Sequence, residues 1–186
     1  MLLVLSCGLL GHAATTLRYW IDPCPKNSHL DCRPADPELA EWALEAWQSA
    51  SGGAIRFERA SKVERAHIRV YWADAQSGLY GEANPIVVDG IRGAEVYIAP
   101  AAAHTDAPDP LLRETILYLT CLHETGHALG LPHTAAFDDI MYNFRYGGDI
   151  DEYFGRYRRL LATRADIRRH AAISPADRKQ LLTIWK

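Results

Sequence analysis

The sequence has few methionines and cysteines and no strong excess of charge of either sign. Of its 186 residues, two are Met and four are Cys, and the formal net charge at pH 7 is −3. A nearly neutral chain has no general attraction for a polyanion, so we exclude nucleic acid as a partner. Beyond the first ten residues no apolar run is long enough to span a bilayer. We therefore expect a monomer with no stable membrane association beyond a leader.

The first residues have the pattern of an export signal. Residues 1–10 are almost entirely apolar, and Gly11-His12-Ala13 offers a small-x-small cleavage site. We predict a signal peptide over residues 1–14 and a secreted protein, extracellular or periplasmic. A lipoprotein anchor at Cys7 is the alternative. Residues 15–186 then form one domain, since a chain with 48% hydrophobic residues at this length supports a single core.

The most informative stretch runs from residue 123 to residue 133 and reads HETGHALGLPH. His123 and His127 are four residues apart, so on a helix both imidazoles project from one face and bind one metal ion. Gly130 then ends the helix in a left-handed conformation, and the chain turns back to deliver His133 as a third ligand. Three imidazoles leave one position of a tetrahedral zinc open, as in catalytic sites. Glu124 lies beside this face and is predicted to be a base rather than a ligand.

A second element follows at Asp139-Ile140-Met141-Tyr142. H-E-x-x-H-x-x-G-x-x-H followed by a methionine turn resembles the metzincin zinc peptidases. Tyr142 directly after Met141, together with Thr134 after the third histidine, is similar to the matrixin branch, which includes the matrix metalloproteinases. The resemblance implies that Met141 forms a hydrophobic floor beneath the three histidines.

The resemblance also implies a fold and a reaction. The fold is α+β, with a twisted, mostly parallel five-stranded sheet, an antiparallel edge strand, two backing helices, and a C-terminal part with the methionine turn and a final helix. The reaction is endopeptidase hydrolysis of a protein or peptide by a metal-activated water, with Glu124 as general base and one Zn²⁺ as cofactor. In the family an acidic residue of the final helix braces the methionine turn, and Asp177 has the matching position. A non-catalytic zinc-binding interaction domain with the same fold is the alternative.

The hydrophobic pattern places the regular elements. Alternation predicts strands over residues 17–21, 55–59, 67–72 and 94–99. Helices are expected over residues 36–50, 111–129, 149–161 and 174–184. Asp36 and Asp109 each precede a proline, which indicates an N-cap followed by proline in the first turn.

A short strand before Pro85 is predicted to be the edge that holds the substrate. Proline is tolerated at a sheet edge, and an exposed edge can pair with an extended peptide. The L-x-G-x-A-x-P spacing also resembles the upper-rim strand of matrixins. The predicted substrate-binding residues are Leu79, Tyr80, Gly81, Glu82 and Ala83.

Removal of the leader leaves three cysteines. Cys24 and Cys32 lie in a proline-rich stretch of an exported chain, so we predict that they form a local disulfide. The alternative is that Cys24 is a latency thiol on the zinc. Cys121 is expected to be buried, free and inert.

The sequence departs from the family in two places. The loop over residues 73–78 is too short for the family's structural calcium and second zinc, so neither is supported, and His104 is interpreted as a surface residue. Residues 144–173 form an insertion with an arginine-rich face made of Arg156, Arg158, Arg159, Arg164, Arg168 and Arg169. These are either a solvated surface or a wall of the cleft that selects substrates.

Overall fold

Five strands form one sheet in the order β2-β1-β3-β5-β4. The computed structural model describes residues 13–25, 30–74, 80–103 and 109–186. Three of the four strand pairings are parallel, and only β4 runs antiparallel, at the edge. This confirms the predicted fold class. The strands are β1 (Thr15–Ile21), β2 (Ile55–Arg59), β3 (Ile68–Trp72), β4 (Gly81–Val88) and β5 (Ile91–Ile98).

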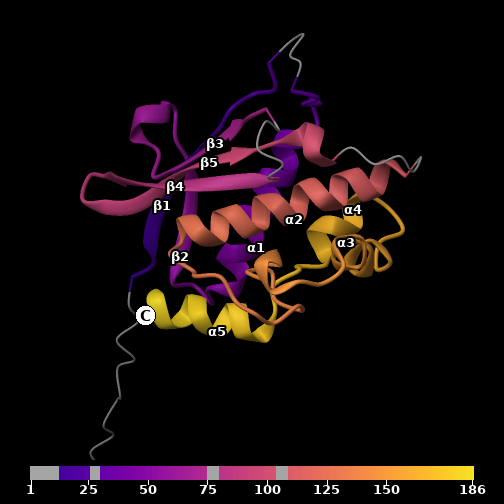
Figure 1. Ribbon diagram of the computed structural model, residues 1–186. Helices are drawn as coiled ribbons and strands as arrows, with labels where there is room; N and C mark the ends of the chain where they lie inside the picture. The colour runs from indigo at the N-terminus through magenta and orange to yellow at the C-terminus, as the bar shows by residue number, and fades with distance from the viewer. Residues whose placement is uncertain (1–12, 26–29, 75–79, 104–108) are drawn as a thin grey trace, which may run out of the picture.

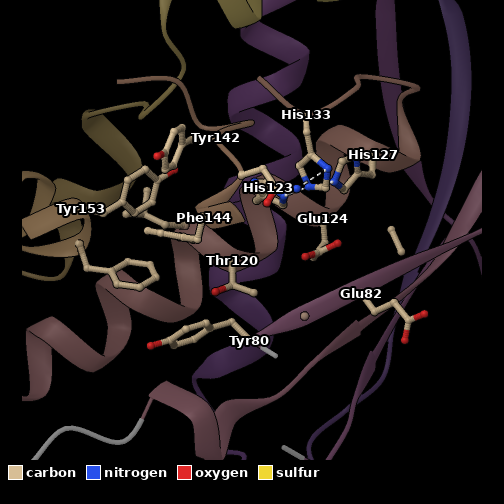
Figure 2. A pocket seen from close by; sticks show the side chains of 15 residues that line it. Tyr80, Glu82, Thr120, His123, Glu124, His127, His133, Tyr142, Phe144 and Tyr153 are labelled. Carbon is tan, nitrogen blue, oxygen red and sulfur yellow. Dashed lines mark hydrogen bonds between the residues drawn. The ribbon is translucent and has the colours of Figure 1, made fainter. Parts of the chain in front are cut away.

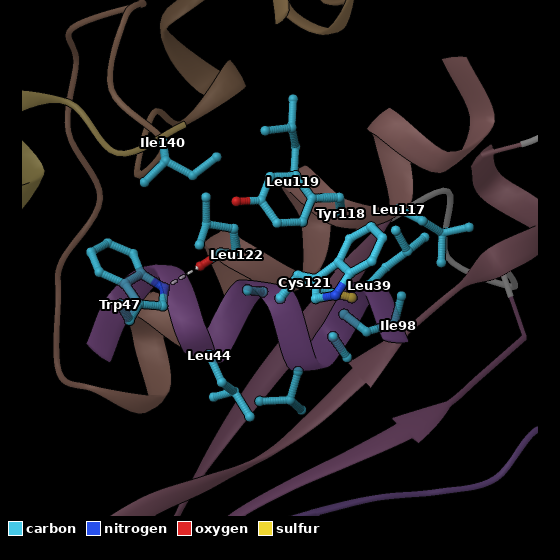
Figure 3. Close-up of a cluster of buried hydrophobic side chains, with 14 of the residues drawn as sticks. Leu39, Leu44, Trp47, Ile98, Leu117, Tyr118, Leu119, Cys121, Leu122 and Ile140 are labelled. Atoms are coloured by element: carbon cyan, nitrogen blue, oxygen red, sulfur yellow. Dashed lines mark hydrogen bonds between the residues drawn. The ribbon is translucent and has the colours of Figure 1, made fainter. Parts of the chain in front are cut away.

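Two long helices, α1 (Asp36–Ala50) and α2 (Pro110–Ala128), cover one face of this sheet (Figure 1). The alternating residues of β3 that face them, Ile68, Val70 and Trp72, are buried. Figure 3 shows the core between the layers, where the Trp47 indole of α1 donates a hydrogen bond to the Leu122 carbonyl of α2 at 2.9 Å. Because Trp47 is fully buried, this bond satisfies its one polar group and fixes α1 against the helix that carries the histidine motif.

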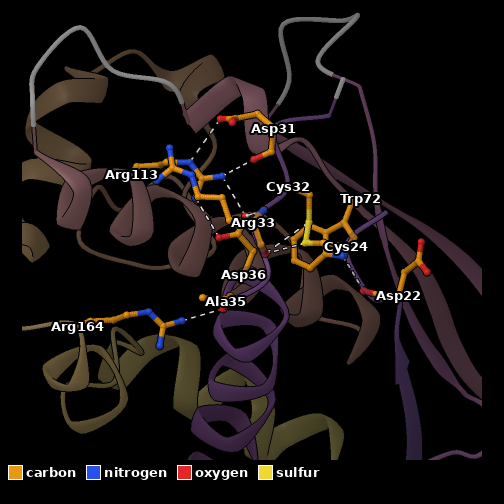
Figure 4. Close-up of a disulfide and its surroundings, with 10 residues drawn as sticks. All are labelled: Asp22, Cys24, Asp31, Cys32, Arg33, Ala35, Asp36, Trp72, Arg113 and Arg164. Carbon is orange, nitrogen blue, oxygen red and sulfur yellow. Dashed lines mark hydrogen bonds and ion pairs between the residues drawn. A yellow bond between two sulfur atoms is a disulfide. The ribbon is translucent and has the colours of Figure 1, made fainter. Parts of the chain in front are cut away.

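The predicted N-cap of α1 is wrong. The cap position is Ala35, which makes no side-chain cap, and Asp36 is already helical. The Asp36 carboxylate instead accepts hydrogen bonds from the Arg33 backbone N–H at 2.8 Å and from both terminal nitrogens of Arg113, each at 3.0 Å (Figure 4). It therefore ties the start of α1 to α2. The matching prediction for α2 is confirmed, because Asp109 accepts from the N–H groups of Leu111 and Leu112.

A disulfide joins Cys24 and Cys32, whose Cα atoms are 5.5 Å apart (Figure 4). Cys121 on α2 is free and buried. Its position in the core and its raised pKa, caused first by desolvation, make it a poor nucleophile.

Removing the disulfide is expected to cost stability. Replacing both Cys24 and Cys32 by Ser should lower the free energy of unfolding by about 2–3 kcal/mol, because a closed short loop restricts the unfolded chain. Urea unfolding with and without a reductant measures this. The reductant should destabilise the wild-type protein by a similar amount and leave the double variant unchanged; an equal response of both proteins would contradict the prediction.

The strand predicted to stop at Pro85 continues to Val88. Pro85 lies opposite Ala94 of β5. The Ala94 N–H does not point toward Pro85 but donates to the His67 carbonyl, next to β3, at 2.9 Å. Along an antiparallel pair of strands, the backbone N–H and C=O groups of successive residues point alternately toward the partner strand and away from it. Pro85 thus occupies an outward-facing position, where its missing N–H disrupts no bond of the sheet.

The chain after α2 forms a separate C-terminal part beside the sheet and helix layers (Figure 1). The predicted helices over 149–161 and 174–184 are present as α3 (Ile150–Arg158) and α5 (Pro175–Ile184), and Ser174 and Asp177 form a capping box on α5. A short helix, α4 (Ala165–Arg169), was not predicted. Three 3₁₀ turns complete the described elements: η1 (Val63–Arg65), η2 (Pro100–Ala103) and η3 (Phe144–Tyr146).

Several arginines of the insertion are not simply a solvated surface. Arg164 pairs with Glu114 of α2 at 3.1 Å, and its guanidinium lies 4.6 Å from the Trp42 ring of α1. Arg168 forms an ion pair with Glu45 of α1, and Arg158 forms one with Asp109 at the start of α2. These contacts attach residues 144–173 to the two core helices. None of the described helices combines the length and apolar character needed to cross a membrane.

Candidate metal centre and its cleft

Three imidazoles meet at the C-terminal end of α2 (Figure 2). His123 and His127 project from one face of the helix, and Gly130, with φ of +91°, turns the chain so that His133 faces both. The Nε2 atom of His133 lies 3.2 Å from that of His123 and 3.1 Å from that of His127. The three residues together are a group that can hold one metal ion.

The donor set fits zinc. The Nδ1 atoms of His123 and His127 lie 2.6 Å from the Ile140 carbonyl and 2.9 Å from the Leu131 carbonyl. A carbonyl only accepts, so each Nδ1 carries the proton and each Nε2 directs a lone pair toward the centre. Burial lowers the pKa of His123 to about 4, which keeps this ring neutral near pH 7. Unprotonated nitrogens that face each other repel, and a shared cation removes that repulsion.

Met141 is completely buried against the helix that carries the histidines. Gly126, next to His127, makes this contact possible, since a Cβ atom there would lie 2.5 Å from the Met141 sulfur and 3.0 Å from the Trp47 ring. The following helix braces the turn, because the Asp177 carboxylate accepts from the Ile140 N–H at 2.8 Å and lies 3.4 Å from the Met141 nitrogen. The methionine turn is thus held from both sides.

Glu124 is a buried carboxyl group that faces the cleft (Figure 2). Only 7% of its surface is exposed, and it makes no hydrogen bond with any residue in the described ranges. Burial, and to a smaller extent the charge of Glu82, raise its pKa to about 8. Gly81 allows the edge strand to approach it, since a Cβ atom there would lie 2.8 Å from the Glu124 Cγ. A carboxyl group with a raised pKa that faces a cleft beside three imidazoles is a candidate for a chemical role.

A cavity of about 410 Å³ extends from the histidines between the edge strand and the insertion. Tyr80, Gly81, Glu82 and Ala83 of the predicted substrate strand line it, whereas Leu79 lies outside the described residues. The wall formed by the insertion, opposite β4, includes the aromatic residues Phe144, Tyr153 and Phe154. The Phe154 ring contacts the ring of Tyr80, just before β4, with the two centroids 5.3 Å apart. The sequence indicated the insertion but not its individual lining residues, Phe144, Tyr153 and Phe154, and it did not place Leu119, Thr120, Tyr142 and Asn143 beside them in the cavity.

The free edge of β4 presents backbone groups to this cavity. Since Pro85 faces outward, the alternation along the strand also turns the backbone groups of Gly81 and Ala83 outward. Both residues retain an N–H and a carbonyl that are available to an extended peptide.

A few predicted features have no structural test. Residues 1–12 of the leader predicted over residues 1–14, including Cys7, and His104 lie outside the described residues. One other group with metal-binding residue types occurs in the part of the chain that is described, Cys24, Cys32 and Asp36, but its two cysteines are bonded to each other.

Comparison with known proteins assigns the family. The matrixin family model matches residues 12–152, and the chain therefore belongs to the matrixins, a family of zinc metallopeptidases. Human matrix metalloproteinase-15 is 30% identical over 133 residues, which are 62% of this chain and 19% of the human protein. The chain thus spans about a fifth of the length of that relative. Archaemetzincin from Methanopyrus kandleri has a similar fold, with a TM-score of 0.50 at 12% identity over 97% of this chain and 98% of the archaeal one.

Proposed function

We propose that this protein is a secreted zinc endopeptidase in which Glu124 is the general base. The observation that carries the proposal is the convergence of three imidazole Nε2 atoms beside a buried, unpaired carboxyl, at one end of a cleft with a free strand edge. The disulfide between Cys24 and Cys32 supports export, because such bonds persist in oxidising compartments outside the cytosol.

Each residue of the site has a distinct role. A zinc ion held by His123, His127 and His133 would act as a Lewis acid on the scissile carbonyl and lower the pKa of water. Glu124 accepts the proton of the attacking water and returns it to the leaving amine. Burial raises the pKa of Glu124 above that of an ordinary carboxyl, which favours proton uptake from the attacking water.

The cleft accounts for binding of an extended peptide. Gly81 and Ala83 offer backbone hydrogen bonds from the edge strand, so the peptide is added to the sheet as a further strand. A bulky apolar side chain fits the cavity beside the histidines, whose walls include Leu119, Phe144 and Phe154. The insertion thereby contributes to selection of the substrate.

The non-catalytic alternative has less support. An interaction domain needs neither a base nor an open metal position. Here the Glu124 carboxyl faces the cavity beside the three imidazoles and is not taken up by a hydrogen bond with a described residue, as expected of a base rather than of a structural group.

Digestion of a diverse mixture of unstructured peptides tests the proposal. Mass spectrometry of the new ends should show internal cuts that stop when a zinc chelator is added and return when zinc is restored. Absence of cuts by protein that carries one zinc ion would favour the non-catalytic alternative. Cuts that persist in chelator would contradict the role of the metal.

The contribution of the insertion can be measured separately. Phe154→Ala enlarges the cavity by removing a ring that is 6% exposed and contacts Tyr80, so cleavage should shift toward larger side chains beside the scissile bond, by about 10-fold in relative kcat/KM. Arg159→Ala, at the C-cap of the same helix, is the control, because that side chain is 61% exposed and does not line the cavity. An unchanged cleavage preference in Phe154→Ala would disprove the role of the insertion.

A further inference from the structure

We propose that Tyr153, in the insertion helix α3, is a positioning residue for His123 and acts through the carbonyl of Ile140. The inference rests on the proposed metal site. It assigns to the insertion a role in metal binding, in addition to its place in the wall of the cleft.

The Ile140 carbonyl joins the two side chains. It lies 2.6 Å from the Nδ1 of His123 and 3.2 Å from the hydroxyl of Tyr153, which is also 3.1 Å from the Asp139 carbonyl. A carbonyl oxygen has two lone pairs, so it can accept from the imidazole and from the phenol together. The one phenol proton is shared between the Asp139 and Ile140 carbonyls, so the hydroxyl contributes to the position of the Ile140 oxygen, and that oxygen orients the His123 ring.

Asp177 contacts the two peptide groups that flank the Cα atom of Ile140. The Ile140 N–H donates to the Asp177 carboxylate at 2.8 Å, and the Met141 nitrogen lies 3.4 Å from it. Asp177 restrains the nitrogen of the peptide between Ile140 and Met141, and Tyr153 restrains its oxygen. Both contacts are buried, so water does not readily replace either of them.

Tyr153 is itself fixed by its surroundings. Its side chain is 4% exposed, and its ring packs between aromatic neighbours, with the Phe144 centroid at 5.0 Å. The Arg156 guanidinium lies 4.5 Å from the ring centroid and also pairs with Asp138. A ring that is packed in this way gives the hydroxyl a defined direction, which is what orientation of a metal ligand requires.

Loss of the hydroxyl should weaken zinc binding. Partners that directly orient a metal-bound histidine change metal affinity by about 10–100-fold when they are removed. Tyr153 is one contact further from the metal, so the lower end of that range, about 10-fold, is expected for Tyr153→Phe. This substitution keeps the ring and its packing.

Tyr157→Phe is the matched control. Tyr157 is on the same helix, is 5% exposed, and donates to the carbonyls of Ile167 and His170 rather than to Ile140. Both substitutions remove one buried hydroxyl, so their effects on the unfolding of the metal-free protein should be similar. Only the substitution at Tyr153 should change metal binding.

The experiment measures the zinc dissociation constant of the intact chain by competition with a chromogenic chelator, and the urea unfolding of the metal-free protein. We expect Tyr153→Phe to raise the Kd about 10-fold and Tyr157→Phe to leave it within about twofold of wild type. Equal Kd values in all three proteins would overturn the inference, and so would equal weakening in both variants, which would indicate general destabilisation. A wild-type chain that binds no zinc would overturn the metal site itself.

Discussion

Replacement of Glu124 by Gln is expected to lower the turnover of a cleaved peptide by about 10³-fold, within the range usual for loss of a general acid–base group. The amide has almost the same shape as the carboxyl, but it cannot accept and return a proton. Since Glu124 makes no hydrogen bond with a described residue, the exchange breaks no structural contact there. The three imidazoles remain in place, so the variant should bind one zinc ion and unfold at a urea concentration close to that of wild type.

Kinetics, metal content and unfolding should be measured on the same preparation. Glu114→Gln is the control, because Glu114 is on the same helix but pairs with Arg164, away from the cleft. This control should retain turnover close to wild type. If Glu124→Gln retains more than about a tenth of the wild-type turnover, another group is the base.

The second large effect concerns stability. Arg113→Met is expected to lower the free energy of unfolding by about 3–5 kcal/mol, because it leaves the Asp36 carboxylate buried without its partner. The two side chains are 4% and 2% exposed. Arg113 also donates to the Asp31 carbonyl at 2.7 Å, so the substitution leaves a second acceptor unpaired. For a domain of ordinary stability, this loss is a large part of the total free energy of unfolding.

A double-mutant cycle separates the ion pair from its surroundings. Asp36→Leu combined with Arg113→Met removes both charges, and the pair of substitutions should cost less than the sum of the single ones. Arg159→Met, which breaks an exposed pair with Glu152, is the control and should cost less than about 1 kcal/mol. Strictly additive losses at Asp36 and Arg113 would show that the two charges do not stabilise each other.

The metal-binding geometry could be predicted from the sequence because it depends on local spacing. The spacing of four from His123 to His127 brings both rings to one helix face, and Gly130 has the left-handed conformation expected of it. The N-cap at Asp109 is equally local. Such features need only the geometry of one or two turns of chain.

The parts that could not be predicted depend on distant partners. An aspartate before proline indicates an N-cap, but at Asp36 a cation 77 residues further along the chain takes the carboxylate instead. Pro85 indicates the end of a strand. In the sheet, however, it lies opposite Ala94, whose N–H donates toward the side of β3, so the backbone of Pro85 faces outward and no N–H donor is needed there. The bond from Tyr153 to the Ile140 carbonyl likewise depends on how α3 packs, which no short pattern encodes.

The position of Pro85 also bears on self-association through the edge of the sheet. An open strand edge is a template on which a second copy of the same chain can add, and long free edges lead to aggregation. β4 needs an open edge at Gly81 and Ala83, but Pro85 removes the next outward donor, and the exposed Val87 lies beyond it. The proline therefore interrupts the run of outward donors, which leaves room for a short peptide and makes the edge a poorer template for a second copy of the chain.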